Sequence, residues 1–225
     1  MMIFEWRHRL STARRVILRS CRSVGKTIGL VCIGFSIRLS FSAMSSVLES
    51  PEIELAETDY HAFNQALWDR LSADSSLVDL DLRIETDRYG QMIMSPPPAP
   101  SHGNKQSEIA FLLKQNMPSG RVISECPVST REGVKAIDVA WCSQEKWNAL
   151  GNQSCFRESP EICVEVVSPG NAKGELEEKK ALYFEEGAIE VWFCDRDGTM
   201  FFFGNEDRQL MPKSALVSDF PDVID

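Results

Sequence analysis

The chain has 225 residues, of which 43% are hydrophobic and 25% are charged. This composition is typical of one globular domain, and it excludes a disordered, collagenous or multi-pass membrane protein. The formal net charge of −9 is unevenly distributed, because residues 1–43 carry seven Arg and one Lys against Glu5, a charge of +7. The other 182 residues therefore carry −16, so a polyanionic substrate would need a local basic patch or metal ions.

The basic leader, residues 1–43, differs in kind from the acidic body, residues 44–225. Its apolar run, Ile28–Ile37, would rise only about 15 Å as a helix, half of a bilayer core, so we expect no spanning helix. An Arg- and Ser-rich, acid-poor leader is typical of a targeting segment. The composition changes sign at Met44, which could instead be the true start. We expect either a mis-assigned start at Met1 or a targeting segment, with a weak membrane anchor as a third reading.

The seven cysteines indicate neither a disulfide framework nor a zinc site. Their number is odd and there is no C-x-x-C pair. Cys142, Cys163 and Cys194 lie inside apolar runs, where a free thiol behaves as a small hydrophobe. We therefore expect a reduced, cytoplasmic protein.

The expected elements of the body alternate between helices and strands. Apolar residues at helical spacing, such as Phe63 and Leu67, predict helices, and apolar runs bounded by turn residues predict strands. Arg88-Tyr89-Gly90 indicates a hairpin, and the prolines that follow at 96–98 and 100 predict an extended segment. The expected helices are Thr58 or Asp59 to Leu71, Ser101–Asn116, Gln144–Leu150 and Ala172–Glu186. The expected strands are Leu82–Asp87, Gln91–Ser95, Arg121–Val128, Val134–Cys142, Glu161–Ser168, Ala188–Asp195 and Thr199–Phe203, with a turn at Ser129–Gly133.

This order predicts an α/β fold of the mixed α+β kind, with a central mixed sheet flanked by helices, in a single domain over residues 44–225.

Two acids lie inside expected core strands. Because side chains alternate along a strand, Asp138 shares its face with the small residues Ala136 and Ala140, while the bulkier Ile137 points to the other face. Glu165 lies within an equally apolar run. Burying an unpaired carboxylate is costly, and two neighbouring carboxylates repel each other unless a cation lies between them. If the two strands are adjacent, the acids suit Mg²⁺ or Mn²⁺.

The following helix offers a lysine as a third member of the site. Lys179 and Lys180 lie equally close to the apolar stripe of this helix, so periodicity does not choose between them. Glu175, Lys179 and Tyr183 form a row at four-residue spacing. In-strand acids and neighbouring lysines also form purely structural ion pairs, and spacing alone leaves that alternative open.

Two further residues compete for a role in the site. Glu190 is embedded in another apolar strand and rivals Glu165 as the buried acid. His102 follows the proline run at the start of a helix, where a capping or solvated role competes with a catalytic one.

Five segments together carry a family resemblance. They are Met94-Ser-Pro-Pro-Pro with His102, Ile137-Asp-Val-Ala, Pro160-Glu-Ile-Cys-Val-Glu-Val-Val-Ser-Pro, Glu178-Lys-Lys-Ala-Leu-Tyr-Phe-Glu-Glu-Gly-Ala and Ile189-Glu-Val-Trp. Over roughly residues 55–223 the chain resembles the bacterial family described as putative restriction endonucleases, within the PD-(D/E)XK nuclease superfamily. The resemblance implies a restriction-endonuclease-like core.

The resemblance also implies roles for individual residues. Asp138 matches the Asp of the PD half and Glu165 the acid of the (D/E)XK half. Valines occupy the two positions after Glu165, so the lysine would come from the next helix as Lys179. Asp138, Glu165 and the Val166 carbonyl would hold Mg²⁺, with Mn²⁺ as the alternative ion. The second-tier candidates are Glu175, Glu190, His102 and Tyr183.

We therefore expect a Mg²⁺-dependent endonuclease that hydrolyses DNA phosphodiester bonds with metal-activated water. The alternative is a catalytically silent interaction or regulatory module that retains the nuclease fold, because a body of −16 without a basic stripe is unusual for a DNA-binding protein. DNA is the expected partner. A homodimer would agree with nucleases that pair to cut both strands, and we expect no stable membrane association.

Overall fold

A computed structural model describes residues 59–78, 80, 82–168 and 173–224 of the chain. The basic leader and the alternative start at Met44 lie outside these residues, as does Thr58, one of the two expected helix caps.

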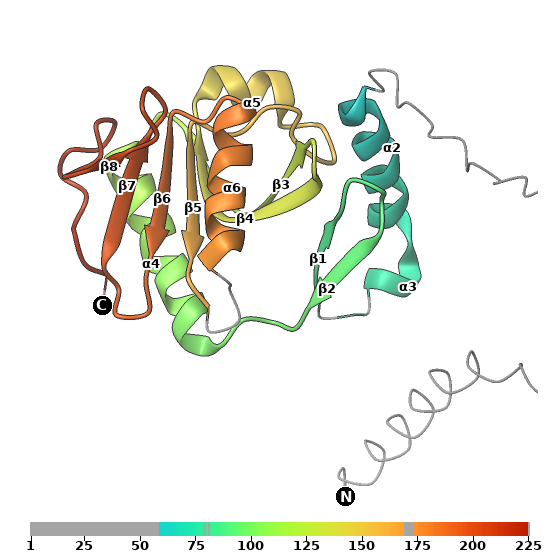
Figure 1. The fold of residues 1–225 in the computed structure, drawn as a ribbon, viewed down its shortest axis with the longest axis horizontal. Coiled ribbons are helices and arrows are strands. Elements are labelled where there is room, and N and C mark those ends of the chain that lie inside the picture. Colours follow the sequence, from blue (N-terminus) through green and yellow to red (C-terminus); the bar gives the residue numbers. More distant parts are fainter. Residues whose placement is uncertain (1–58, 79, 81, 169–172, 225) are drawn as a thin grey trace, which may run out of the picture. The chain divides into compact units, whose positions relative to one another are not determined.

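In the described part of the chain, six strands form the central sheet, in the spatial order β3-β4-β5-β6-β7-β8 (Figure 1). Neighbouring strands are antiparallel except for β5 and β6, which are parallel. The sheet is therefore mixed, which confirms the predicted fold class. β8 was not predicted, because two residues are too few to produce a periodic pattern. The strands are β3 (Arg121–Thr130), β4 (Gly133–Cys142), β5 (Ile162–Val166), β6 (Glu190–Cys194), β7 (Met200–Gly204) and β8 (Leu210–Met211).

Four of the described helices begin and end close to the positions that the sequence predicts, whereas the four-residue helix α3 was not predicted. Asp59 caps the first of them by accepting a hydrogen bond from the Ala62 N–H at 3.1 Å. α4 begins one residue earlier than expected because Pro100 occupies its first turn, where a missing N–H is tolerated. None of the described helices is long and apolar enough to cross a membrane. The helices are α2 (Tyr60–Ala73), α3 (Ser75–Val78), α4 (Pro100–Asn116), α5 (Gln144–Leu150) and α6 (Lys173–Glu185).

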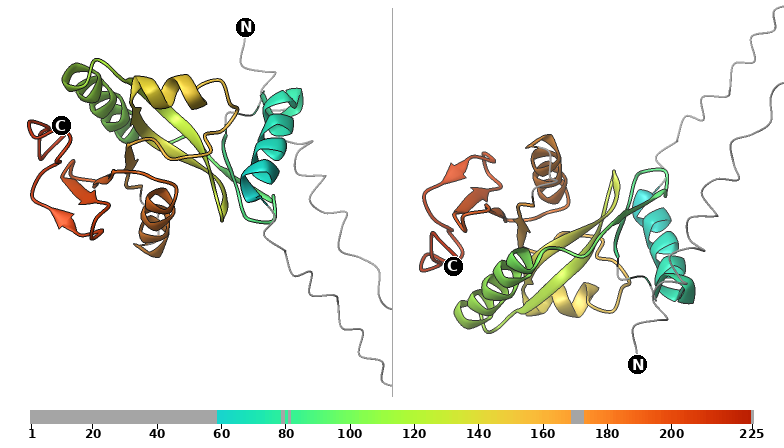
Figure 2. Two further views of the ribbon diagram at one scale, coloured as in Figure 1. Left: turned by 90° about the horizontal axis from the view of Figure 1, so that it is seen from above. Right: turned by 90° about the horizontal axis from the view of Figure 1, so that it is seen from below.

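α4 and α6 cover opposite faces of the sheet, as Figure 2 shows. Ile109 and Leu113 of α4 pack with one core cluster, which contains alternate residues of β4, β5 and β6. Tyr183 and Phe184 of α6 pack with a second cluster on the other face. The five described cysteines are all buried and free, as the apolar runs around three of them suggest.

The expected alternation along β4 is wrong at Ile137. This side chain packs in the second cluster with Ala140, not on the opposite face from it. The ladder between β3 and β4 omits the pair Glu125 and Asp138, and Glu125 has φ +51°. The ladder is therefore distorted beside Asp138, and strict alternation does not hold there.

The turn expected at Ser129–Gly133 is also shorter than predicted. Ser129 and Thr130 belong to β3 and are fully buried. The Asn64 amide of α2 donates to Ser129 Oγ and to the Thr130 carbonyl, both at 2.9 Å. These partners satisfy the polar groups that made the segment look like a turn, so the strand continues.

A separate hairpin lies beside the sheet near α2 (Figure 1) and packs against the start of β4. It consists of β1 (Arg83–Thr86) and β2 (Met92–Ser95), as predicted. The Val134 N–H donates to Thr86 Oγ1 at 2.9 Å. Gly133 has φ +95°, and a Cβ added there would lie 2.4 Å from the Thr86 carbonyl oxygen. The hairpin can therefore approach β4 this closely only because residue 133 is glycine.

Candidate active site

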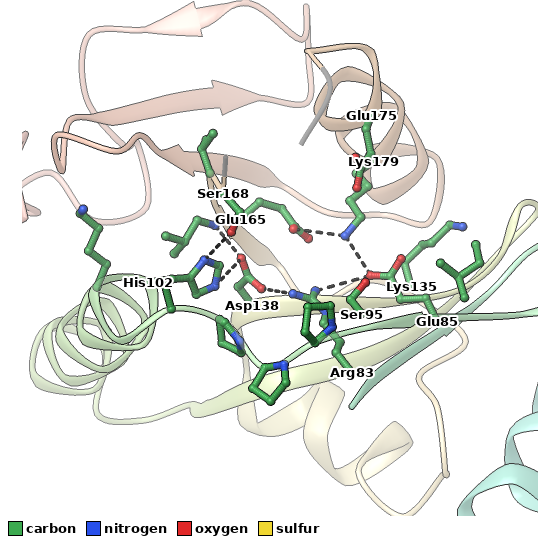
Figure 3. Close-up of a pocket in the computed structure, with 18 of the residues that line it drawn as sticks. Arg83, Glu85, Ser95, His102, Lys135, Asp138, Glu165, Ser168, Glu175 and Lys179 are labelled. Atoms are coloured by element: carbon green, nitrogen blue, oxygen red, sulfur yellow. Dashed lines mark hydrogen bonds and ion pairs between the residues drawn. The ribbon is translucent and has the colours of Figure 1, made fainter. Parts of the chain in front are cut away.

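A pocket of about 820 Å³ lies where β4 and β5 meet the hairpin, α4 and the start of α6 (Figure 3). Asp138 of β4, Glu165 of β5 and Lys179 of α6 all line it. The structure thus brings together the three residues that the sequence analysis singled out, from three different elements.

Three groups contact the Asp138 carboxylate. Its Oδ1 forms an ion pair with the Arg83 guanidinium, and its Oδ2 accepts the Val166 N–H at 2.7 Å. His102 Nε2 lies 3.4 Å from Oδ2. Burial opposes ionisation of Asp138, but the contacts with His102 and Arg83 hold its pKa below the ordinary value. Asp138 is therefore an ionised carboxylate, although only 1% of it is exposed.

Glu165 is also buried, and its two oxygens have different partners. Oε1 accepts a hydrogen bond from the Tyr183 hydroxyl at 2.6 Å, and Oε2 lies 3.3 Å from Lys179 Nζ. The pKa of Glu165 is raised to about 7. Burial raises this pKa most, the Lys179 ammonium lowers it, and the negative charge of Asp138 raises it. Glu165 is therefore held in place by Tyr183 and Lys179 and takes up a proton more readily than an exposed glutamate does.

Lys179 and Lys180 have quite different surroundings. Lys179 lines the pocket and contacts Glu85 Oε1 at 2.9 Å in addition to Glu165. Lys180 Nζ instead lies 4.1 Å from the centre of the Phe203 ring and 2.7 Å from a carboxylate oxygen of Glu177. The structure therefore separates two lysines that helical periodicity leaves equivalent.

Three of the four second-tier candidates lie in or next to the pocket. Glu175 and His102 line it. Tyr183 does not line it, but its hydroxyl donates a hydrogen bond to Glu165. His102 Nδ1 is 2.9 Å from Ser168 Oγ, so the ring bridges Ser168 and Asp138. These contacts link α4 to the loop that follows β5.

Glu190 is not among the residues that line this pocket, so the structure does not bring it to Asp138. In the parallel pairing of β5 with β6, Glu190 lies opposite Ile162, three positions before Glu165. An odd offset along a strand places a side chain on the other face of the sheet. The Glu190 carboxylate accepts four hydrogen bonds there, from Trp192 Nε1, Ser214 Oγ and the N–H groups of Ala215 and Leu216.

The hairpin supplies two charged residues to the pocket, Arg83 and Glu85, in addition to Ile93 and Ser95 of β2. Arg83 and Glu85 are two positions apart on β1 and so share one face of the strand. Arg83 also approaches Glu85 at 3.5 Å and Glu125 at 3.3 Å. Their spacing was a usable signal, but nothing local indicates that this face of the hairpin meets β4.

The ion-paired cluster combines acids with basic side chains. Among the described residues, four carboxylates form a continuous network with the cations of Arg83 and Lys179, and Lys105, Lys135 and Arg196 also line the pocket. The four carboxylates are those of Glu85, Glu125, Asp138 and Glu165. No group of three or more His, Cys, Asp or Glu side chains in the described part of the chain is arranged as a preformed metal site. The oxygen donors around Asp138 and Glu165 nevertheless fit Mg²⁺, which takes one or two protein carboxylates and keeps several waters.

Comparison with known proteins assigns the chain to a family. The family model described as "Uma2: Putative restriction endonuclease" matches residues 73–218. The chain belongs to the Uma2 family. This confirms the predicted family, and the matched range contains the hairpin and all the pocket residues discussed above.

The fold of this Uma2 chain is also similar to a solved structure, described as a putative nuclease belonging to DUF820, from Anabaena variabilis ATCC 29413. The two are 18% identical with a TM-score of 0.50, over 61% of this chain and 84% of the other. At this identity the likeness concerns the fold alone. No curated protein matches the chain.

Proposed function

We propose that this Uma2 chain is a Mg²⁺-dependent endonuclease that hydrolyses phosphodiester bonds of DNA. The observation that carries the proposal is the meeting of Asp138, Glu165 and Lys179 in one pocket, with the Val166 N–H bound to Asp138 at 2.7 Å. The description of the family model, "Putative restriction endonuclease", supports the reaction class and the substrate.

Asp138, Glu165 and the Val166 carbonyl would hold the ion, with Mn²⁺ as the alternative to Mg²⁺. When bound, such an ion lowers the pKa of a water molecule and offsets negative charge on the phosphate.

The protein side chains orient the reacting groups. Although burial opposes it, the carboxylates of Glu165 and Glu85 raise the pKa of Lys179, so the amine stays protonated. Its N–H groups can then donate to a non-bridging phosphate oxygen, whose negative charge grows as water attacks phosphorus. Tyr183 fixes Glu165 through Oε1, and the Val166 N–H fixes Asp138 through Oδ2. These contacts fix the orientation of both carboxylates.

A plasmid assay tests the proposal. Purified full-length protein with Mg²⁺ should nick or linearise supercoiled DNA, and EDTA should stop the reaction. Asp138→Ala should abolish cleavage and Lys179→Ala should lower its rate by ~100- to 1000-fold, whereas wild-type activity in both variants would refute the assignment of the site. Linear product formed in a single binding event would agree with a homodimer, which stays a prediction, as does the cytoplasmic location.

A catalytically silent module with the nuclease fold is the second candidate. It is favoured by the ion pair between Arg83 and Asp138, because this contact already supplies a cation to Oδ1. Calorimetric titration with Mg²⁺ separates the two. Heat of binding in the millimolar range that disappears in Asp138→Ala supports the endonuclease, and the absence of binding supports the silent module.

A further inference from the structure

The lysine of this site needs a positioning device, because it comes from a helix and not from β5. Its stem is four flexible carbons long, so its ammonium group is not oriented by the backbone alone. Glu165 is one partner of Lys179, at 3.3 Å. Under the proposed function, however, Glu165 is also a ligand of the ion, so its oxygens are shared when the ion is bound.

Glu85 is the closer partner of Lys179. Its Oε1 lies 2.9 Å from Lys179 Nζ and also accepts the Ala136 N–H at 3.2 Å. The Glu85 side chain is 15% exposed and that of Lys179 is 7% exposed, so the pair is largely shielded from water. A hydrogen-bonded ion pair in such a setting holds its geometry better than an exposed pair does.

The backbone fixes the position of this carboxylate. Glu85 is next to Thr86, whose hydroxyl accepts the Val134 N–H and whose carbonyl accepts a hydrogen bond from Lys135 Nζ at 3.1 Å. The Ala136 N–H that binds Glu85 belongs to β4, two residues before Asp138. Glu85 is thereby held by the strand that carries Asp138, although it belongs to the hairpin.

We propose that Glu85 is the positioning residue of Lys179. In this arrangement the hairpin orients the lysine, while Glu165 is a ligand of the ion. This inference rests on the proposed function, in which Lys179 acts on the phosphate. It assigns the β1–β2 hairpin to the active site and distinguishes Glu85 from Glu165, which would act directly on the ion.

Amine labelling tests the contact without any activity assay. Full-length protein is treated briefly with acetic anhydride, and acetylation of each lysine is quantified by mass spectrometry. In Glu85→Gln we expect acetylation of Lys179 to rise roughly tenfold, because the charged anchor is gone, while that of Lys180 is unchanged. Glu177→Gln is the reciprocal control, since Glu177 pairs with Lys180. It should expose Lys180 and leave Lys179 protected.

A kinetic cycle then tests the positioning role. Glu85→Gln should lower kcat roughly 100-fold, the size of effect that misplacing a catalytic group by about 1 Å can have, with KM for DNA nearly unchanged. In a Lys179→Ala background the same change should have no further effect. Glu85→Asp, which keeps the charge but is shorter, should behave like Glu85→Gln, and it replaces that variant if Glu85→Gln does not fold.

The outcomes are distinguishable. Unchanged acetylation of Lys179 in both Glu85 variants, or equal losses of kcat with and without Lys179, overturns the positioning role. Wild-type protein without cleavage refutes the proposed function instead, and the labelling result still decides whether Glu85 anchors Lys179.

Discussion

Lys179 Nζ lies closer to Glu85 Oε1, at 2.9 Å, than to Glu165 Oε2, at 3.3 Å. Glu85 is 94 residues away in the sequence and Glu165 only 14. The lysine therefore links the hairpin to the central sheet. The position of Lys179 depends on the packing of the hairpin against the sheet as much as on β5 and α6.

Replacement of Lys179 should affect catalysis far more than replacement of its neighbour. We expect Lys179→Ala to lower the rate of DNA cleavage by ~100- to 1000-fold, since it removes a charge that stabilises the transition state. Lys180→Ala is the matched control, because Lys180 is also buried but packs on Phe203 outside the pocket. Equal losses in the two variants, measured with supercoiled plasmid, would contradict the role of Lys179.

The close approach of the hairpin to β4 predicts a strong effect at Gly133. Gly133→Ala places a Cβ 2.4 Å from the Thr86 carbonyl and imposes φ +95° on a residue that disfavours it. We expect a loss of about 1–3 kcal/mol in the free energy of unfolding, together with reduced cleavage because Arg83 and Glu85 shift. Gly103→Ala in α4 has nothing within 4 Å of the added Cβ, and urea unfolding should show it as stable as wild type or more so.

Glu190 should matter for stability and not for metal binding. Glu190→Ala leaves four donors without their acceptor, three of them in the segment at residues 214–216. We expect a loss of about 3 kcal/mol in urea unfolding. Calorimetric affinity for Mn²⁺, measured on the folded protein, should stay at the wild-type value. A selective loss of Mn²⁺ affinity without loss of stability would show that Glu190 belongs to the site after all.

Stability should depend on pH through Glu186, which lies outside the pocket. Its carboxylate contacts the Tyr60 hydroxyl at 3.0 Å and His61 Nε2 at 3.5 Å. The pKa of Glu186 is raised from 4.5 to about 7. Burial is the largest cause of this rise, the Tyr60 hydrogen bond opposes it, and the neighbouring charge of Glu185 adds to it. Between pH 4.5 and about 7, Glu186 therefore keeps its proton in the folded state but has released it in the unfolded state.

The free energy of unfolding should therefore fall as the pH rises from 4.5 to about 7, by roughly 1 kcal/mol once solvent screening is allowed for. Glu186→Gln cannot ionise, so it should lose this part of the dependence in urea titrations at pH 5 and pH 8. Glu158→Gln, at a side chain that is 67% exposed, should keep the wild-type dependence. An identical slope in wild type and Glu186→Gln would contradict the assignment.

Local patterns in the sequence predicted most of the elements, because their start and end signals are local. Arg88-Tyr89-Gly90 marks the hairpin turn, Gly187 follows the end of α6, and Ser143 caps α5 by accepting the Lys146 N–H at 3.1 Å. The errors lie where long-range contacts override such signals. Ser129 looks like a turn residue until Asn64 of α2 satisfies its hydroxyl.

The candidate site was only partly predictable for the same reason. Asp138 and Glu165 stand out as acids in apolar strands, but Glu190 looks equivalent to them. What separates Glu190 is the register between β5 and β6, which pairs it with Ile162. The spacing of Arg83 and Glu85 places them on one face of β1, but their place in the site depends on contacts between the hairpin and β4.

A crystal structure of the full-length protein soaked in millimolar Mn²⁺, with anomalous diffraction data, tests the central claim most directly. The account predicts an anomalous peak about 2.1 Å from carboxylate oxygens of both Asp138 and Glu165, with Lys179 still bound to Glu85. A pocket without such a peak, in which Arg83 remains paired with Asp138, would contradict the metal-dependent endonuclease and favour the silent module.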